Sequence, residues 1–422
     1  MNAPFLAGYF ASKVVMIVVR ALSISIRLLK PLGLLWLGVF ACAIVHASEN
    51  PWQTHAQPVF LAPLGNSTPL EGQIDTILED QQGFIWLVAA NGLWRWDSKS
   101  LVRAQFEGVD NEAPAPQVNH GFSDAKGRIW IGTSNGLFRL TPGTSSFTAV
   151  APGQLQNITV QAGTVISLPH TDIVILASDR TLYQFDTASA QLEQFPIAPE
   201  TRIHALHINQ ANTLWVGTDK GLFRSELTNS RFTLLEAETD FPQGIRVSTV
   251  TTTTSGKLVV GTAAEGLFVQ SEASGFRNYT LAQDDSPWLF TVTEIRPDVL
   301  LIGTFGDGLI ELNLANQTTR RFRHNRLLPA SLSDNDIWSL FRDSRGLVWI
   351  GSGATLNVYD AGNVAVSHIF GDSGQPEGLM NRKVHAVQAI GNKLIVGSGE
   401  HGLEEFTAEQ GTTRQLWQNG TD

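Results

Sequence analysis

The chain has 422 residues, of which 43% are hydrophobic and 16% charged, a globular composition that excludes disorder as the default state. Its formal net charge is −10, which argues against a nucleic-acid partner, because phosphate binding needs a basic face. The single cysteine, Cys42, lies in an apolar N-terminal leader, so the remainder of the chain has no disulfide, cysteine nucleophile or cysteine metal site.

The leader, residues 1–47, has the features of an export signal. It contains basic residues and no acid, and residues 31–45 form an apolar run of about the length of a signal-peptide core. The three residues that end at Ala47 fit the small-residue rule for cleavage, with the cut before Ser48. We therefore predict an exported, periplasmic chain. An uncleaved leader that anchors the chain in the inner membrane and a lipoprotein site at Cys42 stay open as alternatives.

Eight internal repeats occupy the chain after the leader. In each repeat a small residue follows two positions after a tryptophan or apolar residue of one strand; these residues are Val88, Gly132, Ala177, Gly217, Gly261, Gly303, Gly351 and Gly397. Their spacing, 40 to 48 residues, is typical of one four-stranded propeller blade per repeat.

Each repeat reads as an antiparallel meander. A first strand leads to an Asp-x-x-Gly turn such as 124–127, which suits a type I turn, and the second strand, 129–131 in this repeat, is apolar on both faces. One strand position carries a tryptophan in four repeats: Trp86, Trp130, Trp215 and Trp349. We interpret these as packing residues between blades and not as a ligand stack, because a scaffold needs its residue in many copies and a binding site in only one or two.

The predicted fold is therefore all-β, a β-propeller of four-stranded antiparallel blades with eight repeats. An early strand at 58–62 precedes the first repeat and can close the ring by pairing with the last blade. If it pairs with the seventh repeat, residues 48–373 form a seven-bladed ring and residues 374–422 begin a second propeller; if it pairs with the eighth, the chain is one eight-bladed ring. We favour the seven-bladed arrangement.

The repeat pattern I-x-x-x-x-D-x-x-G-x-I-W-I-G-T-x-x-G-L-x-R resembles the two-component regulator propeller repeat. Residues 74–95, 118–139 and 337–358 carry it best, and the insert 328–337 resembles the serine-leucine-serine segment that precedes blades in this family. The resemblance implies a periplasmic sensor propeller that controls a cytoplasmic histidine kinase, diguanylate cyclase or transcription-factor output. The family usually has two seven-bladed propellers followed by a linker domain and an exit helix, and this sequence ends after eight repeats, so we expect a chain truncated before its output domain.

No motif indicates an enzyme, and we expect none: kinase, cyclase and hydrolase signatures are absent, and no histidines have metal-ligand spacing. We likewise expect no cofactor and no metal. The Asp-x-x-Gly-x-x-Trp sequence resembles the aspartate box of sialidases, but that box is a turn motif, and a sialidase also needs a channel tyrosine and an arginine cluster. A propeller lyase or glycosidase therefore stays a weaker alternative.

A ligand would bind at one mouth of the channel, on loops that a rigid ring holds in place. These loops are the connections that enter the first strands and the turns between second and third strands. The candidate ligand-binding residues in them are Arg202, Arg246, Trp288, Asn335, Trp338, Arg382 and His401. The arginines suit a carboxylate or sulfate and the tryptophans a sugar or another flat apolar face, so we expect an anionic or saccharide ligand. A protein partner and a homodimer are the alternatives.

Overall fold

The computed structural model describes residues 58–417, apart from 66–67, 108–115, 142, 162, 164, 169–170, 198–200, 229–230, 233–234, 272–274, 282–286, 329, 354, 363–378, 380–382, 400–401 and 408–410. Regular structure in this part of the chain is almost entirely β-strand, as the sequence predicts, with one short helix, α2 (Pro152–Leu155). None of the helical structure described here is long and apolar enough to cross a bilayer. The leader lies outside the described residues, so the structure does not test how it is processed.

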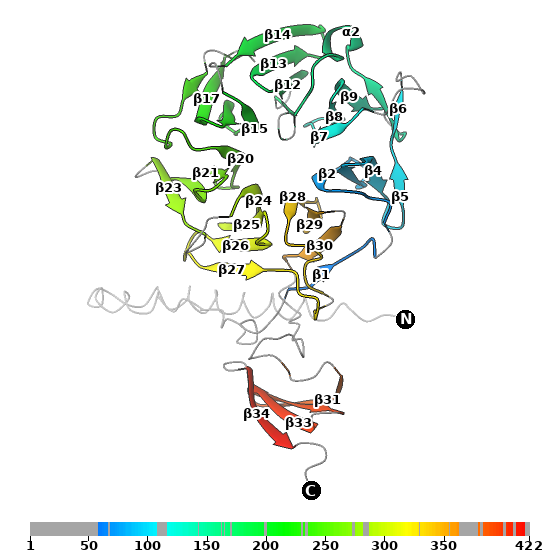
Figure 1. The fold of residues 1–422 in the computed structure, drawn as a ribbon, viewed down its shortest axis with the longest axis vertical. Coiled ribbons are helices and arrows are strands. Elements are labelled where there is room, and N and C mark those ends of the chain that lie inside the picture. The colour runs from blue at the N-terminus through cyan, green and yellow to red at the C-terminus, as the bar shows by residue number, and fades with distance from the viewer. Residues whose placement is uncertain are drawn as a thin grey trace, which may run out of the picture. The chain divides into compact units, whose positions relative to one another are not determined.

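Seven sheets surround a central opening (Figure 1). Blade 1 contains β2 (Ile74–Glu79), β3 (Ile85–Ala89), β4 (Gly92–Trp96) and β5 (Leu101–Arg103). Blade 2 contains β7 (Val118–Ser123), β8 (Ile129–Thr133), β9 (Gly136–Leu140) and β10 (Ser146–Ala149), with β6 (Gln105–Glu107) added in parallel to β10. Blade 3 contains β11 (Val165–Ser167), β12 (Ile173–Ser178), β13 (Thr181–Asp186) and β14 (Gln191–Pro196).

The remaining blades repeat the same meander. Blade 4 contains β15 (Ile203–Ile208), β16 (Thr213–Thr218) and β17 (Gly221–Thr228), with β18 (Arg231–Phe232) and β19 (Glu236–Ala237) both paired with β17. Blade 5 contains β20 (Val247–Thr252), β21 (Leu258–Thr262), β22 (Leu267–Ser271) and β23 (Gly275–Tyr279). Blade 6 contains β24 (Leu289–Arg296), β25 (Val299–Thr304), β26 (Leu309–Asn313) and β27 (Thr319–Phe322). Blade 7 contains β28 (Ile337–Arg342), β29 (Leu347–Ser352), β30 (Leu356–Asp360) and β1 (Phe60–Leu61).

The ring closes through its first strand. Neighbouring inner strands contact one another in an unbroken cycle, in the order β2, β7, β11, β15, β20, β24, β28 and back to β2. Strand β1 pairs antiparallel with β30, with Phe60 opposite Tyr359 and Leu61 opposite Val358. The early strand therefore completes the blade of the seventh repeat, which is the first of the two arrangements that the repeats allow.

The eighth repeat forms a sheet of its own. This sheet contains β31 (Val384–Ile390), β32 (Lys393–Ser398), β33 (Gly402–Thr407) and β34 (Gly411–Trp417), in that order. Among the described strands, none of the seven blades pairs with it.

The repeated tryptophans pack between blades. The indole rings of Trp86 and Trp130 are fully buried, and those of Trp215 and Trp349 nearly so. Trp86 lies with Leu78 of its own blade against Phe147 of blade 2, with the two ring centroids 5.3 Å apart in an edge-on contact. The interpretation as packing residues is confirmed, because each of these rings fills the apolar layer that joins two sheets.

The Asp-x-x-Gly turn carries a second function that its sequence does not show. In blade 2 the Asp124 carboxylate accepts hydrogen bonds from the backbone N–H groups of Lys126 and Arg128, at 2.9 and 2.8 Å, and from the buried indole Nε1 of Trp130 at 2.9 Å. Burial opposes ionisation, but the bonds from Trp130 and Arg128 hold the pKa of Asp124 below its ordinary value. The corresponding distances are 2.8 Å for Asp80 and Trp86 and 3.0 Å for Asp343 and Trp349. The motif therefore ties a turn to the layer between blades.

Candidate functional site

The two mouths of the ring are built from different loops. One mouth, called the N-mouth here, is where the inner strands begin, and the Asp-x-x-Gly turns lie at the opposite one, where the inner strands end. At the N-mouth one hydrogen bond recurs: the residue before an inner strand accepts from the turn after the second strand, as Arg202 does from Asp219 and Trp288 from Phe305, at 3.1 and 3.0 Å. The bond also joins Gln73 to Ala90, Gln117 to Ser134 and Arg246 to Ala263. The prediction that these two kinds of loop share a face is confirmed.

A β-bulge lies at the start of most inner strands. The register shifts by one residue in six of the seven blades, at Asp75, Asn119, His204, Ser248, Phe290 and Trp338. A bulge re-aims the side chain of its extra residue and is common next to binding sites. The residue before each of them is always a buried Ile, Val or Leu, whereas the bulged residue differs in every blade. The residues around the bulge therefore repeat from blade to blade, whereas the side chain at the bulge itself changes.

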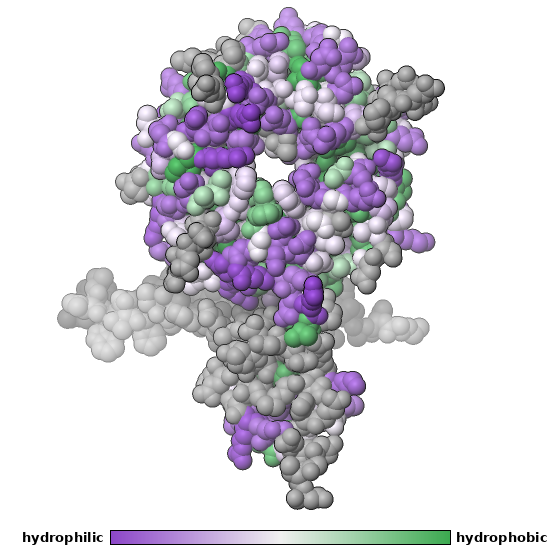
Figure 2. All heavy atoms as spheres, in the orientation of Figure 1, coloured by the Kyte–Doolittle hydropathy of each residue, from purple (hydrophilic) through white to green (hydrophobic). Residues whose placement is uncertain are grey.

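Five of the six bulged residues line a cavity in the channel, whereas the side-chain amide of Asn119 donates to the carbonyl of Val160 at 2.7 Å. The cavity has a volume of about 720 Å³, and Asp75, His204, Ser248, Phe290 and Trp338 are among the residues that line it. Figure 2 shows the opening from one face of the ring. Its wall combines carboxyl, imidazole, hydroxyl and aromatic groups contributed by different blades. This mixture is typical of a ligand site, where a few polar groups converge on an apolar surface.

Aromatic side chains from blades 6 and 7 form one group at the N-mouth. The ring of Phe290 lies between those of Trp288 and Trp338, with centroid distances of 5.5 and 4.4 Å and interplanar angles of 30° and 20°. Phe305 meets Phe290 and Trp338 edge-on, and 52% of its surface is exposed. An exposed phenylalanine beside a half-buried tryptophan offers a flat apolar face to solvent.

Basic and polar nitrogen atoms continue this aromatic group toward blades 5 and 4. The guanidinium of Arg246 stacks on Trp288, 4.8 Å from the ring centroid, and no ion pair joins it to an acid among the described residues. Burial, and next the charge of Arg246, lower the pKa of His204. The Nε2 of His204 and the Nε1 of Trp288 are both buried, and neither has a hydrogen-bond partner in the described part of the chain. Buried polar groups are normally satisfied, so these two nitrogens suit an incoming oxygen acceptor.

Other titratable groups of the channel wall are shifted by burial. Burial raises the pKa of the Asp75 carboxyl to about 6 and lowers the pKa of His120 to about 4. The Nδ1 of His120 lies 3.0 Å from the hydroxyl of Thr76. No three His, Cys, Asp or Glu side chains of the described residues are close enough together to hold a metal ion.

The seven predicted site residues have different environments. Arg246, Trp288 and Trp338 come together through Phe290, as described above. Arg202 is exposed and forms an ion pair with Asp179, at 3.4 Å between Nε and Oδ1. The side-chain oxygen of Asn335 accepts the backbone N–H of His324 at 2.7 Å, and so holds a loop. Arg382 and His401 lie outside the described residues.

Sequence reasoning did not select Phe290, His204, Asp75 or Phe305 as site residues. A signal for the first three is present in the aligned repeats: the residue after the buried Ile, Val or Leu at the start of each inner strand varies, although its neighbours repeat. Strand alternation alone does not show where this residue points, because the bulge breaks the alternation.

The family comparison agrees with the repeat chemistry. Residues 331–354 match the family model described as "Two component regulator propeller". The chain carries a two-component regulator propeller repeat. The matched segment spans the end of the serine-leucine-serine insert, strand β28 and strand β29, so the resemblance given by the sequence is confirmed. No curated protein sequence matches the chain.

Solved structures similar to this chain include extracellular domains of putative bacterial two-component and one-component systems. The extracellular domain of a putative hybrid two-component system from B. thetaiotaomicron is 19% identical, with a TM-score of 0.68 over 86% of this chain and 50% of that one. The extracellular domain of a putative one-component system from the same organism is 19% identical, with a TM-score of 0.58 over 85% of this chain and 46% of that one. Virginiamycin B lyase from Staphylococcus aureus is 10% identical, with a TM-score of 0.55 over 72% of this chain and 98% of that one. The chain thus spans about half the length of these two extracellular domains, and these identities show the propeller fold alone.

Proposed function

We propose that this chain is the ligand-binding part of a periplasmic bacterial sensor and that it has no catalytic activity of its own. The observation that carries the proposal is the ring of bulged residues at the N-mouth. Six blades place six different side chains at one structural position around the channel. A purely structural position would repeat, as the interblade tryptophans do.

The ligand that fits the N-mouth has a flat apolar face and at least one oxygen acceptor. Phe305 and Trp338 supply the surface on which a sugar ring or another planar group can stack. Arg246, with no acid partner in the described part of the chain, suits a carboxylate or sulfate. The nearby Nε1 of Trp288 and Nε2 of His204 would be satisfied by further oxygens. The chemistry therefore favours a small anionic ligand or a saccharide.

The signalling part of the proposal rests on three supports. The leader predicts export, one repeat matches the regulator propeller family, and similar solved folds are extracellular domains of signalling systems. A ligand held between blades 4 to 7 would stiffen one side of the ring. Such a change can bias a signalling output only through a difference in ligand affinity between two states of the sensor.

A binding screen tests the proposal. The chain from Ser48 onward is titrated by calorimetry with acidic and neutral oligosaccharides and with aromatic carboxylates. The Arg246→Ala and Trp338→Ala variants are expected to weaken binding of any positive compound at least tenfold, because each removes a charged or stacking contact of about 1.4 kcal/mol or more. Arg277→Ala is the matched control, since Arg277 is an exposed arginine on the outer strand β23 and its guanidinium also lies over an aromatic ring, that of Tyr279.

The outcomes separate the candidate functions. Binding that both N-mouth variants weaken and the control does not supports the proposal. Binding that survives both variants would remove the N-mouth as the site. Chemical turnover of a bound compound would contradict the sensor proposal and show that the chain is an enzyme.

A further inference from the structure

A second feature of the ring, separate from the N-mouth aromatic group, belongs to no repeat. Four arginines lie within seven residues at the outer edge of blade 6 and just beyond it, in a chain of net charge −10: Arg320, Arg321, Arg323 and Arg326. We call these four residues the arginine ridge. No other repeat carries a comparable run of basic residues at this point, so the scaffold does not require it.

The ridge is held in place by two acids of the same blade. Arg321 and Arg323 both pair with the carboxylate of Asp307, in the turn between β25 and β26, and Arg320 lies 3.6 Å from Glu311. The Arg320 and Arg323 side chains are nevertheless 51% and 56% exposed. Arg326 is exposed and has no ion pair with any described residue. Four guanidinium groups against two carboxylates leave the ridge positively charged and preorganised for further acids.

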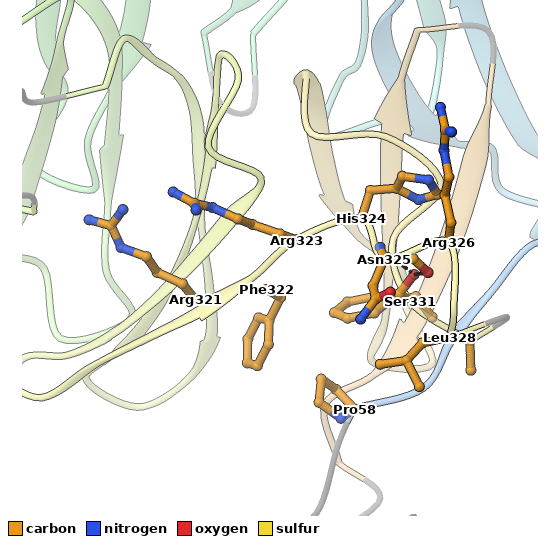
Figure 3. Close-up of a pocket in the computed structure, with 11 residues that line it drawn as sticks. Pro58, Arg321, Phe322, Arg323, His324, Asn325, Arg326, Leu328 and Ser331 are labelled. Atoms are coloured by element: carbon orange, nitrogen blue, oxygen red, sulfur yellow. Dashed lines mark hydrogen bonds between the residues drawn. The ribbon is translucent and has the colours of Figure 1, made fainter. Parts of the chain in front are cut away.

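A hollow adjoins the ridge. Its volume is about 710 Å³, and its apolar lining comes from Pro58, Phe60, Phe322 and Leu328. Figure 3 shows Phe322, Leu328 and Pro58 on one side of the segment 320–326, while the Arg321 and Arg323 side chains extend away from them. The surface therefore combines an apolar hollow with a basic edge.

Strand β27 is the outermost strand of blade 6. It pairs with β26 on one side, and no described strand pairs with its other side (Figure 1). Half of the N–H and C=O groups of an edge strand point outward and can pair with an added strand. This propeller already accepts such additions, because β6 pairs with the outer edge of β10 in blade 2.

We propose that the outer edge of β27 binds an extended acidic segment of a partner protein as an added β-strand. The segment's backbone would pair with β27, its carboxylates would contact the arginine ridge, and one large apolar side chain would occupy the hollow beside Phe322. Backbone pairing gives such complexes their affinity, and side-chain contacts give them their specificity. A polypeptide matches this combination better than an anionic lipid or a polysaccharide, because only a polypeptide supplies a strand backbone.

A fluorescent peptide tests the proposal directly. The probe is a short fluorescein-labelled peptide of alternating glutamate and valine with one phenylalanine, and its binding to the chain from Ser48 onward is followed by fluorescence anisotropy. Replacing every glutamate by glutamine should weaken binding at least tenfold, and so should N-methylation of alternate peptide nitrogens, which removes strand pairing without changing charge.

Protein variants locate the site. The double variant Arg323→Glu, Arg326→Glu should weaken binding of the acidic peptide at least tenfold. Its remaining affinity for the peptide should also fall less steeply with rising salt concentration than the affinity of the wild type does. Arg180→Glu, Arg224→Glu is the control, because these two arginines are also about half exposed and each lies beside an acid. Thermal unfolding of each variant shows whether the fold is kept, and Arg246→Ala should leave peptide binding unchanged, which separates this edge from the N-mouth.

Three outcomes would overturn the proposal. Absence of peptide binding would mean that the arginines only keep other strands away from the edge. Binding that N-methylation leaves intact would exclude strand addition. Equal binding of vesicles rich in phosphatidylglycerol, or of an acidic polysaccharide, with the same loss in the ridge variant would show a general anion surface instead of a peptide site.

Discussion

Ring closure depends on a strand of two residues, and its stability can be tested at Phe60. The Phe60 side chain is 3% exposed, and its ring packs against Tyr359 and Phe322 with centroid distances of 5.3 and 5.7 Å. Its backbone N–H also donates to the carbonyl of Ala330 at 2.8 Å. The next residue, Leu61, is in the same strand but is 61% exposed.

The Phe60→Ala variant should be destabilised by about 3–5 kcal/mol, the usual cost of removing a buried phenyl ring from a core that cannot collapse around the space. At about 2 °C per kcal/mol for a domain of this size, the unfolding temperature should fall by about 6–10 °C. Leu61→Ala, the matched control, should change the free energy of unfolding by less than about 0.5 kcal/mol.

Thermal and urea unfolding, followed by tryptophan fluorescence, measure both variants. Trp96 and Trp349 lie in the apolar layer between blades 7 and 1 and report its opening. Equal stability of the Phe60→Ala and Leu61→Ala variants would refute the reasoning, because it would mean that β1 does not hold the ring closed.

Three further predictions follow from the interior of the ring. In urea unfolding, Asp124→Ala should lower the free energy of unfolding by about 2–3 kcal/mol, since it leaves the buried Nε1 of Trp130 and two backbone N–H groups without their acceptor. The control Asp186→Ala removes a carboxylate that also accepts backbone N–H bonds but lies at an exposed turn, so it should cost about 1 kcal/mol or less. Equal costs would contradict the proposed role of the Asp-x-x-Gly turn. Gly303→Ala should destabilise the protein by about 1–3 kcal/mol in the same assay, because the added Cβ would lie 2.7 Å from Thr291 and 2.8 Å from Ile337 of the next blade. At the control position Gly306 nothing lies within 4 Å of a new Cβ, so Gly306→Ser should show only the smaller cost of its positive φ. Stability should fall as pH decreases from about 6.5 to about 4, because burial lowers the pKa of both His120 and His207 to about 4 and protons then bind the unfolded chain in preference. The raised pKa of Asp75, about 6, acts in the opposite direction over about pH 6 to 4. In thermal unfolding, Asp75→Asn should therefore steepen the fall of stability with decreasing pH and His120→Gln should make it shallower, and an unchanged slope in both variants would contradict these assignments.

The blades could be predicted from the sequence because their physics is local and repeated. An Asp-x-x-Gly turn, a strand apolar on both faces and a second turn with glycine recur at a nearly constant spacing, so each repeat defines its own meander. The partner of β1 could not be fixed in this way. In the structure the third strand of the seventh repeat, Leu356–Asp360, pairs with β1, whereas that of the eighth, Gly402–Thr407, pairs with β34 of its own repeat. The packing of Phe60 against Phe322 and Tyr359 accompanies the first pairing.

The candidate site could be predicted only in part. Loop position was enough to select Arg246, Trp288 and Trp338, because residues at the start of inner strands share one mouth. Phe290 and His204 were not selected because they were assigned to the inner strands, where the two-residue period does not show that a bulge turns their side chains toward the channel. Trp338 occupies the same bulge position, but it was selected as a residue at the entry of its strand. The arginine ridge was also missed, because a run of charge in a sequence does not show that it lies along an unpaired edge.

The most direct test of the central proposal is amide hydrogen exchange of the chain from Ser48 onward, with and without a compound found by the binding screen. The proposal predicts slower exchange at the N-mouth segments 203–206, 246–250, 288–291, 303–307 and 335–339, and no change at the Asp-x-x-Gly turns 80–83, 124–127 and 343–346 of the opposite mouth. Protection confined to the opposite mouth or to β27, with the N-mouth segments unchanged, would contradict the assignment of the ligand site.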